Sequence, residues 1–162
     1  MQAVRVSTYS FLAFMMKNRN SKLNKVKYSL LSRLGSMFNL SFSSHEMLNK
    51  KIFGVDGIKR KVLVVEENNG SNSSYIIELD KVKSISMKSV YNSIKPDELQ
   101  KKRLEEFLKT IYLQFEFRDG REAIALPFFE SQKNNIDDLP VLEKKTKNWK
   151  MIFSKMTGTK NK

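Results

Sequence analysis

The sequence predicts an α+β domain, in which an antiparallel meander or partly open barrel of about six strands is preceded by a basic amphipathic helix and closed by a C-terminal amphipathic helix. Two observations predict this fold. Asp-Gly and Asn-Gly dipeptides separate short apolar runs after Lys51, as in β-hairpins. The last segment then places apolar residues at helical spacing. A chain of 162 residues that is 40% hydrophobic has the size and composition of a single folded domain.

Three dipeptides mark the expected hairpins: Asp56-Gly57, Asn69-Gly70 and Asp119-Gly120. Asn, Asp and Gly tolerate the positive φ angles that a type I′ turn requires. We expect tight two-residue turns at the first and third dipeptides and a longer polar loop at the second. A further tight turn is expected at 80–81. The strands between these turns are expected at 51–55, 58–67, 75–79, 82–91, 111–118 and 121–128.

Two of these strands indicate where they lie in the fold. In 111–118 the odd-numbered residues are apolar and the even-numbered residues are polar, as in a strand with one face on the core and one in water. Residues 62–65 are apolar on both faces. We expect that strand in the centre of the sheet or under a helix.

Helical segments are expected on both sides of the strands. Between residues 22 and 38, apolar residues recur at steps of three and four: Leu23, Val26, Leu30, Leu34, Met37 and Phe38. This spacing predicts an amphipathic helix that packs on the domain. Ser43 and Glu46 have the spacing of a capping box, which predicts a short helical turn.

Two later segments have helix-start signals. Pro96 opens a segment with a partial helical stripe, which predicts a helix inserted between strands. Asp137 and Asp138, with Pro140 in the first turn, open the last helix. Trp149 lies on the apolar stripe of that helix, so we expect its ring to be buried in the core.

The net charge of +13 arises at the two ends of the chain. Residues 1–45 hold seven Lys or Arg and no acid, residues 46–142 hold sixteen of each sign, and residues 143–162 hold seven Lys and one Glu. A neutral body with basic ends favours anchoring at an anionic surface, because a Lys or Arg near acidic lipid headgroups contributes about 1 kcal/mol. Solvated charge without a partner is the alternative.

An uncharged, mostly apolar run at 6–16 is followed by Lys17, Arg19, Lys22, Lys25 and Lys27. A spanning helix needs about 20 largely apolar residues, and this run has about half that length. Three interpretations stay open, namely the remnant of a longer membrane anchor, an interfacial helix or a poor signal peptide, beside that of a disordered tail. We expect a tail or anchor remnant at 1–21, one α+β domain at 22–157 and a basic disordered tail at 158–162.

A second basic cluster opens a strand directly after a hairpin turn. Cations in this position can meet anionic headgroups, and an ordinary polar strand start explains them equally well. The residues expected to bind an anionic surface are therefore Lys59, Arg60 and Lys61 together with Lys17, Arg19, Lys22, Lys25 and Lys27.

The order of antiparallel strands followed by one helix that carries Trp149 is similar to that of pleckstrin-homology-like barrels. Residues 22–156 also resemble uncharacterised bacterial proteins in which an N-terminal membrane helix precedes a small cytoplasmic domain. Residues 53–61 and Lys147-Asn148-Trp149 carry this likeness. The resemblance implies a cytoplasmic domain at the inner face of the cell membrane, and it implies no activity.

The residue pattern contains no recognisable catalytic or cofactor motif. Cysteine is absent and His45 is the single histidine, so a zinc site of the usual kind is excluded. The six glycines form neither a P-loop nor a dinucleotide fingerprint. We therefore expect a protein that is not an enzyme and that uses no cofactor or metal.

The function that the sequence favours is a membrane-surface-associated binding module whose partner is an anionic membrane or a protein. The alternative is a nucleic-acid-binding protein that uses its basic ends. This alternative predicts an affinity for DNA or RNA that falls steeply with salt. The sequence favours no particular oligomeric state.

Overall fold

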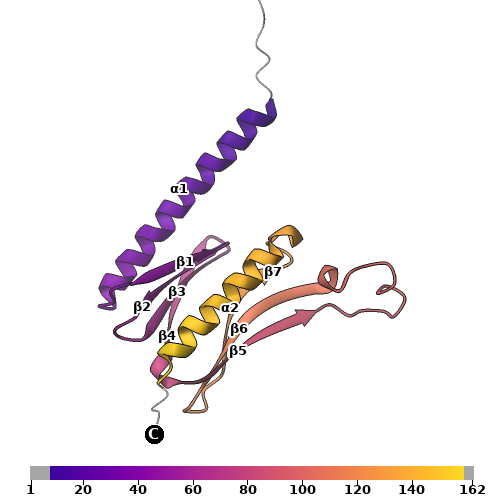
Figure 1. The fold of residues 1–162 in the computed structure, drawn as a ribbon. Helices are drawn as coiled ribbons and strands as arrows, with labels where there is room; N and C mark the ends of the chain where they lie inside the picture. The colour runs from indigo at the N-terminus through magenta and orange to yellow at the C-terminus, as the bar shows by residue number, and fades with distance from the viewer. Residues whose placement is uncertain (1–7, 159–162) are drawn as a thin grey trace, which may run out of the picture.

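The computed structural model describes the backbone of residues 8–158 and the side chains of residues 21–158. These residues form seven antiparallel strands in two sheets, with a long helix at the start and another at the end (Figure 1). The α+β class, the antiparallel pairing and the two flanking helices agree with the sequence prediction. The expected meander or barrel of about six strands is not confirmed, because the two sheets are separate and open.

Parts of the expected tails lie outside the described residues. These parts are residues 1–7 with the side chains of 8–20, and residues 159–162. The helix α1 (Thr8–Met37) is continuous across the boundary expected between residues 21 and 22.

The first sheet contains β1 (Ser44–Leu48), β2 (Lys51–Asp56), β3 (Lys61–Asn68) and β4 (Ser71–Glu78) in chain order. All of β2 and residues 62–65 of β3 are buried, because a helix covers each face of this sheet. Leu31 of α1 packs on one face, and Trp149 of the last helix packs on the other. The expectation that residues 62–65 form a covered strand is confirmed.

The hairpin turns have lengths opposite to those expected. Asn69 and Gly70 form the tight turn, with φ of 50° and 79°, and Asn68 pairs with Ser71 across it. The Asp56-Gly57 dipeptide lies in a longer loop, since Asp56 pairs with Lys61. The third turn is longer still, because the last pair of its hairpin joins Phe115 to Ile124. A dipeptide indicates where positive φ is tolerated, but strand pairing decides the loop length.

The second sheet contains β5 (Val82–Tyr91), β6 (Leu108–Phe117) and β7 (Ile124–Glu130). The strand expected at 82–91 is confirmed, as is the alternation in β6, which buries Ile111, Leu113, Phe115 and Phe117. A short 3₁₀ turn, η1 (Leu79–Lys81), joins β4 to β5. These two strands belong to different sheets, so the chain changes sheet at this corner.

Two predictions of helical structure are wrong. Residues 44–48 form β1, because the Ser43 hydroxyl donates to the carbonyl oxygen of Val55 at 3.1 Å and the segment pairs with β2. The segment after Pro96 contains turns and a 3₁₀ helix, η2 (Leu104–Phe107). Of the apolar residues on the expected stripe, Leu99 and Leu104 are exposed and Phe107 is buried, while the buried Leu108 already belongs to β6, so too few pack to support an α-helix.

The packed face of α1 differs from the stripe that the sequence predicts. Leu31 is buried with Leu30 and Leu34 beside it, whereas Leu23 and Val26 are 48% and 63% exposed. The helix is longer than the sheet, so its N-terminal part projects past it (Figure 1). The remaining members of the expected stripe, Met37 and Phe38, are exposed at the end of the helix.

Phe42 fixes the distance between α1 and the first sheet. Its ring lies between two glycines, where an added Cβ would stand 2.5 Å from the ring at Gly35 and 2.7 Å at Gly54. Asn39, two residues beyond the end of α1, has φ of 54°, and the Leu40 N–H donates to the Gly35 carbonyl oxygen at 2.7 Å, as in a Schellman motif.

The last helix, α2 (Leu139–Met156), closes the core between the two sheets. Trp149 is 7% exposed, and its ring centroid lies 4.9 Å from that of Phe53 and 5.2 Å from that of Phe153. The indole N–H donates to Glu46 of β1 at 3.2 Å. The core role expected for Trp149 is confirmed. A short 3₁₀ turn, η3 (Ile136–Asp138), precedes this helix.

Candidate functional site

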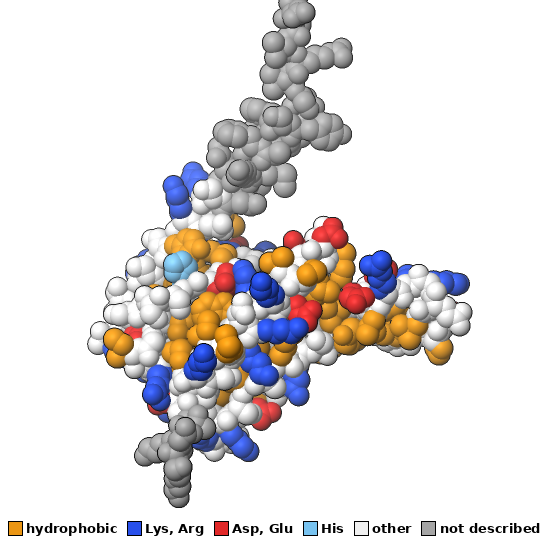
Figure 2. Space-filling view, viewed as in Figure 1, with side chains coloured by type: hydrophobic (Ala, Val, Ile, Leu, Met, Phe, Trp, Pro, Cys, Tyr) orange, Lys and Arg blue, Asp and Glu red, His pale blue; other side chains and the backbone are white. Residues whose placement is uncertain are grey.

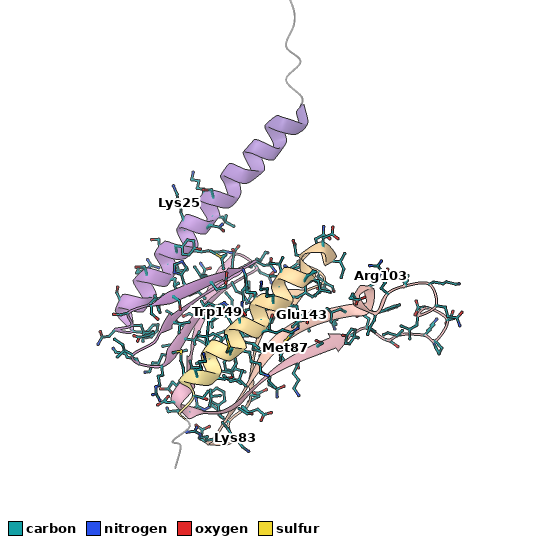
Figure 3. All side chains as sticks on the ribbon, viewed as in Figure 1. Lys25, Lys83, Met87, Arg103, Glu143 and Trp149 are labelled. Atoms are coloured by element: carbon teal, nitrogen blue, oxygen red, sulfur yellow. The ribbon has the colours of Figure 1, made fainter. Side chains whose placement is uncertain are left out.

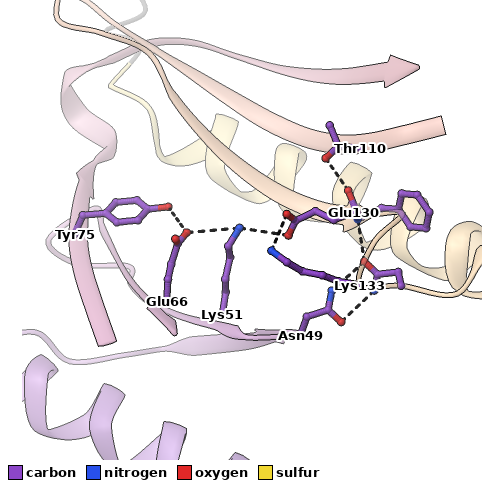
Figure 4. Close-up of polar contacts among 9 residues, drawn as sticks. Asn49, Lys51, Glu66, Tyr75, Thr110, Glu130 and Lys133 are labelled. Carbon is purple, nitrogen blue, oxygen red and sulfur yellow. Dashed lines mark hydrogen bonds and ion pairs between the residues drawn. The ribbon is translucent and has the colours of Figure 1, made fainter. Parts of the chain in front are cut away.

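A group of polar side chains, most of them buried or half-buried, joins the two sheets (Figure 4). Lys51 of β2 lies 3.6 Å from Glu66 of β3 and 3.6 Å from Glu130 of β7. The Tyr75 hydroxyl donates to Glu66 at 3.3 Å, and burial together with this carboxylate raises the pKa of Tyr75. Lys133 pairs with Glu130 at 2.8 Å. Because each of these charges has a partner, we interpret this group as a structural bridge between the sheets.

Within residues 21–158, no three His, Asp or Glu side chains come together as a metal site would require. The imidazole of His45 packs edge-on against Tyr28, with 5.0 Å between ring centroids. The carboxylates of Glu66 and Glu67 point to different lysines, Lys51 and Lys27. These acidic neighbours therefore act in separate ion pairs.

The exposed face of α1 carries cations together with apolar side chains. Lys22, Lys25 and Arg33 are exposed and follow each other with Ser29 at steps of three and four residues, so they share one face. Val26, which is 63% exposed, lies among them. Lys25 projects from α1 away from the sheets (Figure 3). We call this surface, formed by Lys22, Lys25, Val26, Ser29 and Arg33, the α1 basic face.

A hollow of about 400 Å³ lies between the α1 basic face and the first part of β4. Its charged groups are cations, and none of its side chains is a carboxylate. Such a hollow offers hydrogen-bond donors and positive charge, which suit an anion. It is lined by Lys25, Val26, Ser29, Leu30, Arg33 and Asn72.

Lys27 lies on the opposite face of α1 from these cations. It is buried, its Nζ donates to the Asn49 carbonyl oxygen at 3.2 Å, and it pairs with Glu67 at 3.6 Å. Lys27 thus holds α1 on the first sheet, and we leave it out of the binding surface. The side chains of Lys17 and Arg19, also expected to bind, lie outside the described residues.

The second expected cluster forms part of a charged loop region. Lys59 donates from Nζ to the Asn39 carbonyl oxygen, and Lys61 pairs with Glu78 at 3.7 Å. Arg60 is exposed and has φ of 53°. Glu78 also accepts a hydrogen bond from Lys81, which is the main reason that its pKa is lowered.

Asp56 sets the shape of this loop. It is 1% exposed and accepts hydrogen bonds from the backbone N–H groups of Ser41, Ile58 and Lys59 at 2.8, 3.0 and 2.8 Å. Burial alone would raise the pKa of Asp56, but the three N–H donors and the Lys59 charge outweigh it, so the pKa is lowered. The carboxylate is therefore the form that the loop requires.

The structure does not bring the two expected cation groups into one surface. Lys59 contacts Asn39 just beyond the end of α1, and Lys25 lies fourteen residues earlier, which is about 21 Å along a helix. Ser29 and Asn72 were not among the expected site residues. The spacing of Ser29 from Lys25 and Arg33 could have identified it, whereas Asn72 approaches α1 only through the fold.

None of the helices in the described part of the chain has the length and apolar character needed to cross a bilayer. Comparison of the chain with models of protein families, with curated proteins and with solved structures gives no significant match. The likeness to pleckstrin-homology-like barrels and to bacterial membrane-anchored proteins therefore stays a prediction.

Proposed function

We propose that the protein is a non-enzymatic binding module that associates with an anionic membrane surface through the α1 basic face. One observation carries the proposal. Lys22, Lys25 and Arg33 share an exposed face, with no carboxylate partner among the described residues, on a helix whose sequence holds no Asp or Glu. The opposite face of the same helix packs on the first sheet, so the cations are held in place by the fold.

The charge of this face is sufficient for measurable membrane association. Three cations at an anionic surface contribute about 3 kcal/mol, on the order of a hundredfold in partition. Exposed Val26 and Leu23 add apolar contact at the headgroup boundary, which salt does not screen. Because the cytoplasmic leaflet is the anionic one, we propose the inner face of the cell membrane as the location.

Co-sedimentation of the full chain with vesicles tests this proposal. The vesicles contain phosphatidylcholine alone or with about a third phosphatidylserine. We expect binding to the anionic vesicles, weaker binding at high salt, and a loss on the order of a hundredfold in the variant with Lys22→Gln, Lys25→Gln and Arg33→Gln.

A matched control variant distinguishes an effect of where the three cations lie from an effect of the lower net charge. Lys101→Gln, Lys144→Gln and Lys155→Gln remove the same number of charges from exposed positions on the β5–β6 connection and α2. This control is expected to bind like the unmodified protein. Equal losses in the two triple variants, or binding that does not depend on phosphatidylserine, would contradict the proposal.

The nucleic-acid alternative has its own test. Stacking on bases requires aromatic rings next to cations. Among residues 21–158, Tyr28, Phe38 and Tyr91 are the exposed aromatic residues; they lie on α1, beyond its end and on β5, so within this range they form no shared platform. Fluorescence anisotropy with labelled single-stranded DNA and RNA at low salt would favour the alternative if the affinity exceeded that for anionic vesicles.

A further inference from the structure

β5 has an edge without a partner strand in the described structure. It is the first strand in the order β5-β6-β7 and pairs with β6 alone. Every second residue of an antiparallel strand directs its N–H and C=O groups away from its neighbour. About five of the ten residues of β5 therefore present backbone hydrogen-bonding groups at this edge, where another extended segment can add as a strand.

The other outer strands are less suited to accept a strand. β1 has five residues, and its Glu46 is bound by Lys145 and Trp149 of α2. β7 contains Pro127, which lacks an N–H donor. The edge of β4 begins with four exposed polar residues, 71–74, and offers no apolar contact there.

α2 lies beside β5 and forms a groove with it. A hollow of about 430 Å³ lies between Met87 of β5 and one face of α2. Met151 is 53% exposed and Met87 is half-buried, and both line this hollow. Figure 3 shows Met87 on β5. Flexible Met side chains adapt to apolar groups of different shape. We call this surface, lined by Met87, Lys147, Lys150, Met151 and Ser154, the β5–α2 groove.

Cations lie on α2 inside the β5–α2 groove and on the neighbouring edge strand β5. Lys147 and Lys150 line the groove on α2, and β5 carries the exposed Lys83 and Lys88. Figure 2 shows basic side chains over α2, next to apolar ones. Glu143 pairs with Lys147 at 2.6 Å, while Lys83, Lys88 and Lys150 have no carboxylate partner among the described residues. The charge of the groove and of the β5 edge together therefore complements an acidic segment.

We propose that the β5–α2 groove binds an extended acidic segment of another protein. The segment pairs with the edge of β5 and directs alternate side chains to opposite faces of the sheet. Its apolar side chains lie on Met87 and Met151 on the α2 side, and its carboxylates lie beside Lys88, which follows Met87 in β5 and therefore points to the other face. A second copy of this chain is a poor occupant, because it would place the same lysines against each other on a protein of net charge +13. This inference is independent of the membrane proposal, which uses α1.

The first experiment measures peptide binding in solution, without lipid. The probe is a fluorescein-labelled peptide of ten residues in which Glu and Val alternate, and its counterpart alternates Lys and Val. We expect the full-length protein to bind the Glu–Val peptide at least tenfold more tightly than the Lys–Val peptide, with amide shifts concentrated at residues 82–91 in NMR spectra. Absence of binding at millimolar peptide would overturn the proposal.

N-methylation of the peptide tests strand pairing. All Val N–H groups of an extended Glu–Val peptide lie on one edge, and all Glu N–H groups lie on the other. Of two peptides methylated on either the Val or the Glu nitrogens, one is expected to lose binding and the other to keep it. If both peptides behave alike, backbone pairing with β5 is ruled out.

Charge-reversal variants locate the site. Lys83→Glu with Lys88→Glu on β5 is expected to weaken binding of the Glu–Val peptide at least tenfold. Lys144→Glu with Lys155→Glu makes the same charge change on the solvent face of α2 and is expected to change the affinity less than twofold. Circular dichroism verifies that both variants fold. Equal effects of the two double variants would place the binding elsewhere and overturn the proposal.

Discussion

Replacement of Asp56 by Ala tests how the loop between β2 and β3 is held. The change removes the acceptor of three backbone hydrogen bonds, from Ser41, Ile58 and Lys59. A hydrogen bond to a charged group contributes about 1.5–3 kcal/mol, but water can reach the exposed loop residues Ile58 and Lys59 once the carboxylate is gone. We therefore expect a loss of about 3 kcal/mol in the free energy of unfolding at neutral pH.

The effect of Asp56→Ala has a defined pH dependence. The folded-state pKa of Asp56 is lowered, so its stabilisation is fully present above the ordinary carboxyl pKa of 3.8. It is lost as the pH falls below that value and through the folded-state pKa. The difference in free energy between the unmodified protein and the variant should thus shrink below about pH 4.

Urea unfolding followed by the fluorescence of Trp149, the single tryptophan, measures this difference from pH 7 to pH 3. Asp97→Ala serves as a control, because the Asp97 side chain is exposed and its removal is expected to leave the free energy of unfolding unchanged over the same pH range. A loss below 1 kcal/mol for Asp56→Ala, or a difference that stays constant over this pH range, would refute the reasoning.

Three further substitutions probe the packing that positions α1 and α2, each measured by urea unfolding with circular dichroism. Trp149→Ala opens a cavity between the sheets and should destabilise the fold by about 3–5 kcal/mol. Gly54→Ala places a Cβ 2.7 Å from the ring of Phe42 and should destabilise by about 1–3 kcal/mol, whereas an unchanged stability would show that α1 can move away. Lys51→Ala leaves Glu66 and Glu130 without their shared cation and should destabilise by about 2 kcal/mol, less when Glu66→Gln is added.

The sequence was informative where a local pattern and the tertiary fold agree. Period-two alternation located β6, and the apolar stripe with Pro140 located α2 and buried Trp149. It was misleading where two local structures compete. The spacing of Ser43 and Glu46 suits a helical cap, but pairing with β2 makes the same residues a strand.

The candidate surfaces were predictable only in part, because composition does not show which face of a helix packs. The acid-free N-terminus indicated α1, yet Lys27 lies among the same cations in sequence and is buried against Glu67. Lys22 and Lys25 stay exposed because they lie on the face of α1 opposite Lys27. The β5–α2 groove could not be predicted, since Met87 and Met151 lie sixty-four residues apart and line one hollow only because α2 packs beside β5.

The contact between the α1 basic face and the membrane can be measured directly. Cysteine is absent from the chain, so Val26→Cys accepts a single environment-sensitive fluorophore in this face, and Leu99→Cys, at another exposed apolar position, is the control. Addition of phosphatidylserine vesicles should shift the emission of the label at residue 26 to the blue and leave that at residue 99 unchanged. An unchanged emission at residue 26, or an equal shift at both positions, would contradict the account.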